Sequence, residues 1–254
     1  MQADKAVILL GGKGTRLSAL FPDIPKALVP VSGRQFLAWQ LDWLLANNIK
    51  QVLLAAGYMG DKIENWVKQQ PFKDQVSISI EPMPLGTGGA VKYAVQYRVG
   101  KESFWVLNGD SLLPDLNFAN MEKAHRKSGV LGTIAVTAIE DSGRYGTVVF
   151  DKNGKITRFE EKKNRGAGWI NAGIYLLDSS IFSSISPAEN ISIENEIFPK
   201  LAAEGKLSVF QAKPPLLDMG TPQGLKNMEN YLAKKQEFSP PTSTSVIPDL
   251  IQPS

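Results

Sequence analysis

The chain has no cysteine and a single histidine, His125. The missing cysteines exclude disulfides, zinc–thiolate sites and thiol nucleophiles. One histidine excludes a histidine-rich metal site and makes a Ser-His-Asp triad improbable.

Long apolar runs and strong charge are also missing. No apolar stretch of about 18 residues and no signal-peptide core occurs, so we expect a cytoplasmic protein with no membrane partner. The net charge is +3 and includes no long basic run, which argues against nucleic acid as a partner and leaves anionic small molecules open. With 254 residues, of which 43% are hydrophobic, the chain can bury a sizeable core.

What the chain does contain is a regular alternation of strand and helix patterns in its first half. Short buried runs at residues 6–10, 51–56, 76–80 and 104–107 predict strands, and helical spacing fills the intervals around 36–45, 61–69 and 88–97. This alternation predicts an α/β fold, Rossmann-like and doubly wound around a mostly parallel sheet.

The second half has a different pattern. Residues 146–150 and 155–159 flank Asp151-Lys-Asn-Gly154, which predicts a β-hairpin inserted into the fold. Further strands are predicted at 131–138, 169–177 and 207–211, and helices at 193–204 and 221–235, the last with Thr221 as N-cap. We expect residues 1–235 to form one domain and residues 236–254, rich in Pro, Ser and Thr, to form a flexible tail.

The first strand ends in a glycine-rich loop, Gly11-Gly-Lys-Gly-Thr-Arg-Leu17. Backbone N–H groups and the cations Lys13 and Arg16 suit a phosphate group. The loop is neither a Walker A loop nor a dinucleotide fingerprint, because Lys13 lies between the glycines and Leu17 replaces the third one. Taken alone, the loop could also be a structural turn, which is the less favoured interpretation.

Two further segments carry candidate ligand-binding groups. Lys26, fixed by Pro25 before it, suits a phosphate oxygen, although most lysines are solvated surface residues. Glu81 begins a segment with several glycines, residues 81–90, and its carboxylate could accept from the N1–H and amino group of guanine. A helix-entry turn with a solvated acid is the alternative.

Asp110 and Asp218 each follow a short apolar strand and stand beside glycines. Open α/β sheets place ligands at such strand ends. One or two carboxylates, completed by phosphates and water, suit Mg²⁺. A single aspartate there would more often be a turn residue, and the pair favours a metal site.

Seven motifs together resemble the sugar-1-phosphate nucleotidylyltransferases, in the order of that family and over residues 5 to about 233. The subgroup that the sequence resembles most is the D-glycero-α-D-manno-heptose 1-phosphate guanylyltransferases of polysaccharide synthesis. Mannose-1-phosphate guanylyltransferases and uridylyl or thymidylyl relatives remain alternatives. The motifs are Gly11-Gly-Lys-Gly-Thr-Arg-Leu17 with Pro25-Lys26, Leu85-Gly-Thr-Gly-Gly-Ala90, Asn108-Gly-Asp110, Arg144-Tyr-Gly146, Phe159-Glu-Glu-Lys162, Asn171-Ala-Gly-Ile-Tyr175 and Asp218-Met-Gly-Thr-Pro222.

The resemblance implies a reaction between a nucleoside triphosphate, GTP first, and a sugar 1-phosphate. The sugar phosphate attacks the α-phosphorus in line and pyrophosphate leaves, with Mg²⁺ as cofactor. It implies catalytic roles for Arg16, Lys26, Asp110 and Asp218, the two aspartates holding the metal. The implied nucleotide-binding residues are Leu10, Gly11, Gly12, Lys13, Gly14, Thr15, Arg16, Glu81, Gly86, Thr87 and Asn108, and the implied sugar-phosphate-binding residues are Lys26, Gly109, Gly146, Glu161, Lys162 and Asn171.

Two other functions fit the sequence less well. A nucleotide-sugar-binding module without activity is disfavoured by the joint presence of Arg16, Lys26, Asp110 and Asp218. A dinucleotide-dependent oxidoreductase would need an acid after the second strand, where residues 55–57 are Ala-Ala-Gly. A homo-oligomer is an open alternative, because Trp39 and Trp43 could serve an interface or the core.

Overall fold

The structure is a computed structural model that describes residues 3–12, 14–96, 102–142, 146–160, 166–186 and 189–237. Of the predicted tail, residues 236–254, the first two residues belong to the helix that ends at Glu237, and the rest lies outside these ranges. None of the described helices is long and apolar enough to cross a membrane.

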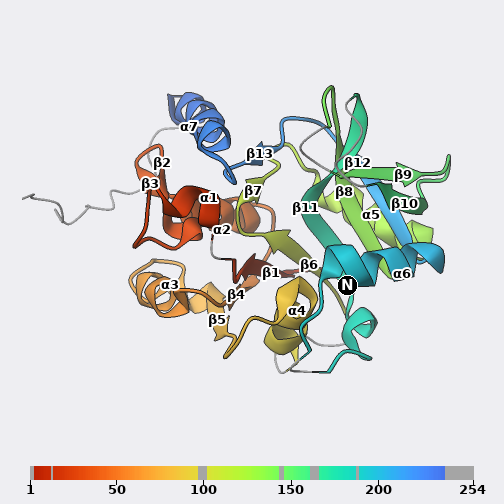
Figure 1. Ribbon diagram of the computed structural model, residues 1–254, viewed down its shortest axis with the longest axis horizontal. Helices are drawn as coiled ribbons and strands as arrows, with labels where there is room; N and C mark the ends of the chain where they lie inside the picture. The colour runs from red at the N-terminus through yellow and green to blue at the C-terminus, as the bar shows by residue number, and fades with distance from the viewer. Residues whose placement is uncertain are drawn as a thin grey trace, which may run out of the picture.

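One mixed sheet of nine strands forms the centre of the fold (Figure 1). Its parallel part has the order β6-β1-β4-β5, as the alternating pattern predicts for a doubly wound fold. These strands are β1 (Lys5–Leu10), β4 (Gln51–Ala56), β5 (Val76–Ile80) and β6 (Ser103–Asn108).

The second half of the chain extends the sheet beyond β6. The long strand β11 runs antiparallel to β6 and to β8, and β12 lies parallel to β8 at the outer edge. The predicted hairpin is present as β9 and β10. These strands are β8 (Gly132–Ile139), β9 (Thr147–Phe150), β10 (Ile156–Glu160), β11 (Gly168–Asp178) and β12 (Leu207–Ala212).

Helices cover both faces of the sheet. Alternate residues of β1 point to opposite sides: Ala6 and Ile8 pack with α2, α3 and α5, whereas Val7 packs with α4 and α6. The helices are α1 (Thr15–Ser18), α2 (Phe36–Ala46), α3 (Gly60–Val67), α4 (Gly86–Val95), α5 (Phe118–Ser128), α6 (Phe198–Ala203) and α7 (Pro222–Glu237). The sequence pattern did not predict α5. The helix predicted at 193–204 is divided into a π-helical turn, Ile193–Ile197, and α6.

A cluster of hydrophobic residues, smaller than those on the two faces of the sheet, packs α7 against the rest of the molecule. Two short two-stranded sheets contribute to it: β2 (Pro30–Val31) with β3 (Arg34–Gln35), and β7 (Ser111–Leu112) with β13 (Leu217–Asp218). Trp43 packs edge-on against Phe118 in the core, and Trp39 Nε1 donates to Val31 O, 3.0 Å away. Both tryptophans are therefore at least partly engaged inside the chain.

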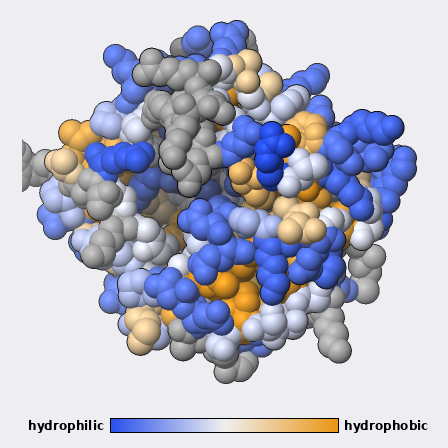
Figure 2. Space-filling model, turned by 45° about the vertical axis from the view of Figure 1, so that its right-hand side comes forward, coloured by the Kyte–Doolittle hydropathy of each residue, from blue (hydrophilic) through white to orange (hydrophobic). Residues whose placement is uncertain are grey.

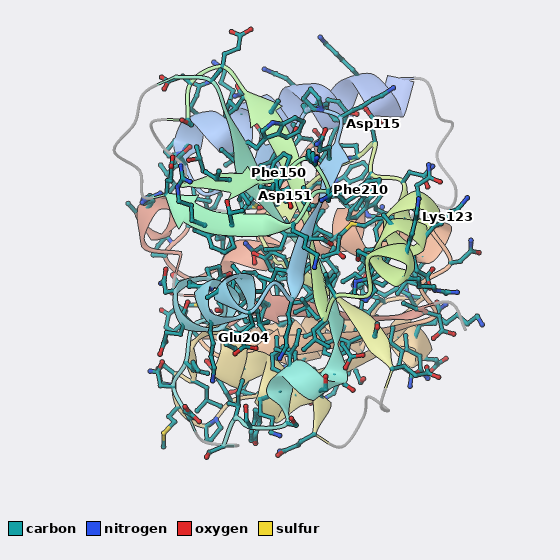
Figure 3. All side chains as sticks on the ribbon, turned by 90° about the vertical axis from the view of Figure 1, so that its right-hand side faces the viewer. Asp115, Lys123, Phe150, Asp151, Glu204 and Phe210 are labelled. Atoms are coloured by element: carbon teal, nitrogen blue, oxygen red, sulfur yellow. The ribbon has the colours of Figure 1, made fainter. Side chains whose placement is uncertain are left out.

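The turn between β9 and β10 lies against the edge strand β12. Val209 N donates to Gly154 O at 2.8 Å, and Phe150, Asp151 and Phe210 lie near one another in this region (Figure 3). The contact occupies backbone groups of a strand that would otherwise be open to pairing with another chain. Figure 2 shows a face of the molecule on which hydrophilic residues surround smaller hydrophobic patches.

Candidate active site

A cavity of about 420 Å³ lies at the carboxyl ends of the parallel strands. Open α/β sheets bind ligands at this edge. Eleven of the predicted site residues line it, together with others that the sequence did not single out. The predicted ones are Leu10, Gly11, Gly12, Gly14, Lys26, Glu81, Gly86, Thr87, Asn108 and Gly109, joined by Asp110; the unpredicted ones include Tyr58 and Glu194.

The glycine-rich loop forms one wall of this cavity. A Cβ added at Gly12 would meet no atom within 4 Å, so this residue faces open space. Gly14 has φ +59° and its missing side chain makes room for the stem of Lys26, 3.1 Å from the added Cβ. Arg16 is exposed in α1 and is not among the lining residues, and Lys13 lies outside the described residues.

Glu81 follows β5 and reaches across the ends of β4 and β1. Its Oε2 accepts from Leu85 N at 3.2 Å. A Cβ added at Gly57 or Gly11 would come within 2.5 or 3.0 Å of Oε1, so glycine at both positions leaves room for the carboxylate. Burial raises the pKa of Glu81 above its usual value, although the Leu85 hydrogen bond opposes this shift.

Lys26 and Asp110 form an ion pair through Nζ and Oδ2. Lys26 opens a short 3₁₀ turn, Lys26–Leu28, and Asp110 directly follows β6. Ser111 Oγ donates to the other carboxylate oxygen of Asp110 at 3.0 Å. The sequence predicted both residues as functional, but it did not predict that they pair across 84 positions.

Asp218 stands on the strand beside Asp110. Strand β13 pairs antiparallel with β7, and Met219 N donates to Asp110 O at 3.0 Å. One carboxylate oxygen of Asp218 accepts from Gly220 N at 2.6 Å. No group of three or more metal-ligating side chains occurs among the described residues. Two hard-oxygen carboxylates on neighbouring strands fit Mg²⁺, which completes its coordination with phosphates and water.

The glycines at the start of α4 are in close contact with residues 189–197. Gly88 N and Gly89 N both point at Ile191 O, at 2.8 and 3.3 Å. A Cβ at Gly88 would lie 2.7 Å from Ile197 Cδ1, and one at Gly89 would overlap Glu189 O. The close approach that these glycines allow is therefore made by residues 189–197.

This segment brings Glu194, which the sequence did not single out, to the cavity. Its Oε2 accepts from Thr87 Oγ1 at 2.7 Å and from Ser192 Oγ at 3.3 Å, and its Oε1 accepts from Tyr175 OH at 3.4 Å. Tyr175 is fully buried in β11, and burial, followed by the charge of Glu194, raises its pKa well above the usual range. The phenol therefore stays protonated and can donate.

Asn171 belongs to the same network. Its Nδ2 donates to Tyr175 OH at 3.0 Å, and its Oδ1 accepts from Gly173 N at 2.8 Å. Gly173 has φ +71°, and a Cβ there would lie 2.6 Å from Asn108 Nδ2. The network thus runs from the predicted sugar-binding Asn171 to Glu194 in the cavity wall.

The remaining predicted sugar-binding residues are Gly146, Glu161 and Lys162, which lie next to or within parts of the chain that the structure does not describe. Gly146 is half-buried next to the Glu160 carbonyl, 3.0 Å from an added Cβ, and it does not line the cavity. Glu161 and Lys162 lie outside the described residues. The side chain of Thr15 is likewise not described.

Comparisons with known proteins agree with the arrangement of the cavity. A family model described as nucleotidyl transferase matches residues 5–235. A mannose-1-phosphate guanyltransferase beta-A of Xenopus laevis is 36% identical over 242 residues, which cover 93% of this chain and 67% of that protein. A D-glycero-alpha-D-manno-heptose 1-phosphate guanylyltransferase of Campylobacter jejuni is 35% identical over 222 residues, covering 86% and 96%.

A solved structure is also similar. HddC from Yersinia pseudotuberculosis complexed with GMP-PN superposes with a TM-score of 0.79 at 31% sequence identity, over 90% of this chain and 99% of that one. The strand-end cavity, the matched family model and these relatives lead to one conclusion. The chain belongs to the nucleotidyl transferase family and is a sugar-1-phosphate nucleotidyltransferase.

Proposed function

We propose that the protein is a guanylyltransferase that joins GTP to a sugar 1-phosphate of manno configuration and releases pyrophosphate. D-glycero-α-D-manno-heptose 1-phosphate is the first candidate substrate and mannose 1-phosphate the second. The relatives described above support this proposal, because their names contain these two sugar phosphates and both sugars have the manno configuration. The observation that carries the guanine assignment is Glu81, a carboxylate placed between two glycines at one end of the cavity.

The base would bind at that end. Guanine offers two adjacent donors, N1–H and the exocyclic amine, and a carboxylate accepts from both. Glu81 Oε1 faces the space left by Gly11 and Gly57, while Oε2 is held by Leu85 N. Adenine and the pyrimidines lack this donor pair, so a Glu81 carboxylate discriminates in favour of GTP.

The phosphates would meet at the centre of the cavity. An oxygen of the sugar phosphate forms a bond to the α-phosphorus in line with the bond that breaks, and pyrophosphate leaves with that electron pair. Lys26, held by Asp110, neutralises charge between the two substrates. Holding of the β- and γ-phosphates by Lys13 and Arg16 stays a prediction. This route requires no covalent intermediate on the protein.

Asp110 and Asp218 would hold Mg²⁺ between them. When bound, the ion supplies charge stabilisation at the α-phosphate and the leaving oxygens. Ser111 on Asp110 and Gly220 on Asp218 fix the two carboxylates for this role.

The test is a matrix of GTP, ATP, UTP, CTP and dTTP against heptose, mannose and glucose 1-phosphates with Mg²⁺, scored by pyrophosphate release. We expect the highest kcat/KM with GTP and a manno-configured sugar. A preference for another triphosphate would contradict the guanine assignment, and a preference for glucose 1-phosphate would contradict the sugar assignment.

A further inference from the structure

Glu194 is a carboxylate in the cavity wall that none of the roles above uses. It lies in the π-helical turn Ile193–Ile197, and such turns are often found at functional sites. The turn is fixed firmly: Ile193 N donates to Thr87 Oγ1 at 2.8 Å, and Ile191 N donates to Leu85 O at 2.9 Å. The position of Glu194 is therefore set by α4 as well as by its own segment.

The two oxygens of Glu194 are not equally occupied. Oε2 accepts two hydrogen bonds, from Thr87 and Ser192, whereas the described partner of Oε1 is Tyr175 OH at 3.4 Å. A carboxylate has about four acceptor positions. Oε1 thus retains capacity to accept from a ligand in the cavity.

The charge of Glu194 selects the kind of group that it can meet. A phosphate would be repelled by a carboxylate, whereas a hydroxyl group can donate to it. The phosphates belong at Lys26, which supplies the positive charge. Glu194 is therefore suited to a hydroxyl-bearing part of a substrate.

The place of Glu194 in the fold favours the sugar over the ribose. Its partner Tyr175 and the linked Asn171 belong to β11, which flanks β6 on the side away from β1, β4 and β5. Glu81, the proposed base-reading residue, follows β5 at the opposite side of this strand order. The sugar of the sugar 1-phosphate is the hydroxyl-bearing group expected near β11.

We propose that Glu194, oriented by Thr87 and Tyr175, accepts a hydrogen bond from a hydroxyl group of the sugar and is a specificity-determining residue for the sugar 1-phosphate. This inference rests on the proposed function. Tyr175 and Thr87 are positioning residues in this proposal, because they act on the sugar through Glu194. For Thr87 this role differs from the nucleotide-binding role that the sequence predicts, since its hydroxyl bonds to Glu194 and to Ile193 N.

The experiment compares wild type with Glu194→Gln, Glu194→Ala and Tyr175→Phe. The matched control is Glu196→Gln, an exposed acid in the same turn that accepts from Ser192 N at 2.8 Å and keeps an acceptor oxygen after the change. Glu194→Gln keeps the shape of the side chain in case Glu194→Ala does not fold. Each variant is tested for its melting temperature, for GTP binding by calorimetry, and for kinetics with mannose 1-phosphate and its monodeoxy analogues.

We expect Glu194→Gln to raise the KM for mannose 1-phosphate by about tenfold to a hundredfold, the value of one hydrogen bond to a charged group. The KM for GTP should stay within about twofold, since the proposed base-reading Glu81 follows β5, at the opposite side of the strand order from β11. One monodeoxy analogue should be disfavoured by wild type and not by Glu194→Ala. Tyr175→Phe should cause a smaller change of the same kind, and Glu196→Gln none.

Two results would overturn the inference. One is an unchanged KM for the sugar 1-phosphate in Glu194→Gln. The other is a raised KM for GTP together with a lost penalty for 2′-deoxy-GTP, which would place the ribose at Glu194.

Binding of mannose 1-phosphate in calorimetry without a triphosphate separates this inference from the proposed function. If wild type binds the sugar phosphate but releases no pyrophosphate with any substrate pair, the proposed function fails, and weaker binding by Glu194→Gln still supports the inference. If both proteins bind it equally, the inference fails even where turnover is normal.

Discussion

The two ends of the cavity are built in different ways. At the proposed nucleotide end, Gly11 and Gly57 leave room for the Glu81 carboxylate, and Gly12 faces open space. At the proposed sugar end, Thr87 and Tyr175 both donate hydrogen bonds to Glu194, which lines the cavity. One end is defined by side chains that are missing, and the other by a network of side chains that hold each other.

The charged centre between these ends should give the largest effect. Asp110→Asn removes the charge that pairs with Lys26 and half of the proposed Mg²⁺ site, so we expect kcat to fall by about a hundredfold or more. Asp218→Asn should behave alike. Asp115→Asn, at an exposed loop aspartate, serves as the control (Figure 3). Activity of either site variant within a few fold of wild type, with an unchanged circular dichroism spectrum, would rule out the two-carboxylate centre.

The nucleotide end is tested by Glu81→Gln. The amide keeps one acceptor and loses the second, so the preference for GTP over other triphosphates should drop by about tenfold or more. Turnover with the other triphosphates should change little. The ratio of kcat/KM values for GTP and ATP measures this. An unchanged ratio would mean that Glu81 does not read the base.

The raised pKa of Glu81 gives the same residue a pH signature. The carboxylate must be ionised to accept from guanine, and its pKa lies above the usual value because of burial. The GTP preference should therefore be complete above the raised pKa and be lost as the pH falls through it. In Glu81→Gln this pH dependence should disappear, and a preference in wild type that ignores pH would contradict the assignment.

Glycine substitutions compare the two ends directly. Gly89→Ala would push a methyl group into Glu189 O, so we expect a loss of about 1–3 kcal/mol in the free energy of unfolding. Gly12→Ala meets no protein atom, so its stability should match that of wild type while GTP binding weakens. Denaturant unfolding and calorimetry give both values. An equal loss of stability in Gly12→Ala and Gly89→Ala would contradict the distinction between a glycine that faces open space and one that packs against the chain.

His125 provides a comparison outside the cavity. It is buried beside Thr133, whose hydroxyl lies 2.9 Å from Nδ1, and burial lowers its pKa. Its neutral form is favoured by the fold, so its contribution to stability is present above the unfolded pKa of about 6.5 and decreases as the pH falls below it. In His125→Gln the melting temperature should change less with pH over this range, and the KM values of both substrates should not change. A pH-independent wild-type melting temperature there would contradict this account.

The sequence predicted the parallel part of the sheet because each strand is a short buried run that ends at glycine or a polar residue. Because Gly11, Glu81 and Asp110 each follow such a run, the sequence also predicted that they lie at one edge of the sheet. Helix α5 was missed because two of its buried positions are Glu122 and His125, so its apolar period is hidden. One partner of Glu122 comes from a distant segment: Ala3 N donates to its carboxylate at 2.8 Å.

Glu194 could not be found in the same way. In the sequence it stands in the segment Ser192-Ile-Glu-Asn-Glu196, which is typical of a solvated helix start with Ser192 as N-cap. Its partner Thr87 lies 107 positions away, and only the packing of residues 189–197 on Gly88 and Gly89 brings the two together. Pairings of this kind depend on the tertiary structure and leave no local pattern.

The most direct test of the central claim follows the α-phosphorus. Wild-type protein is incubated with Mg²⁺, α-³²P-labelled GTP and either D-glycero-α-D-manno-heptose 1-phosphate or mannose 1-phosphate, and the products are separated. We predict that the label enters a GDP-sugar, that unlabelled pyrophosphate appears in equal amount, and that neither forms without the sugar phosphate. Label recovered as GMP, or left in GTP with every sugar 1-phosphate, would contradict the account.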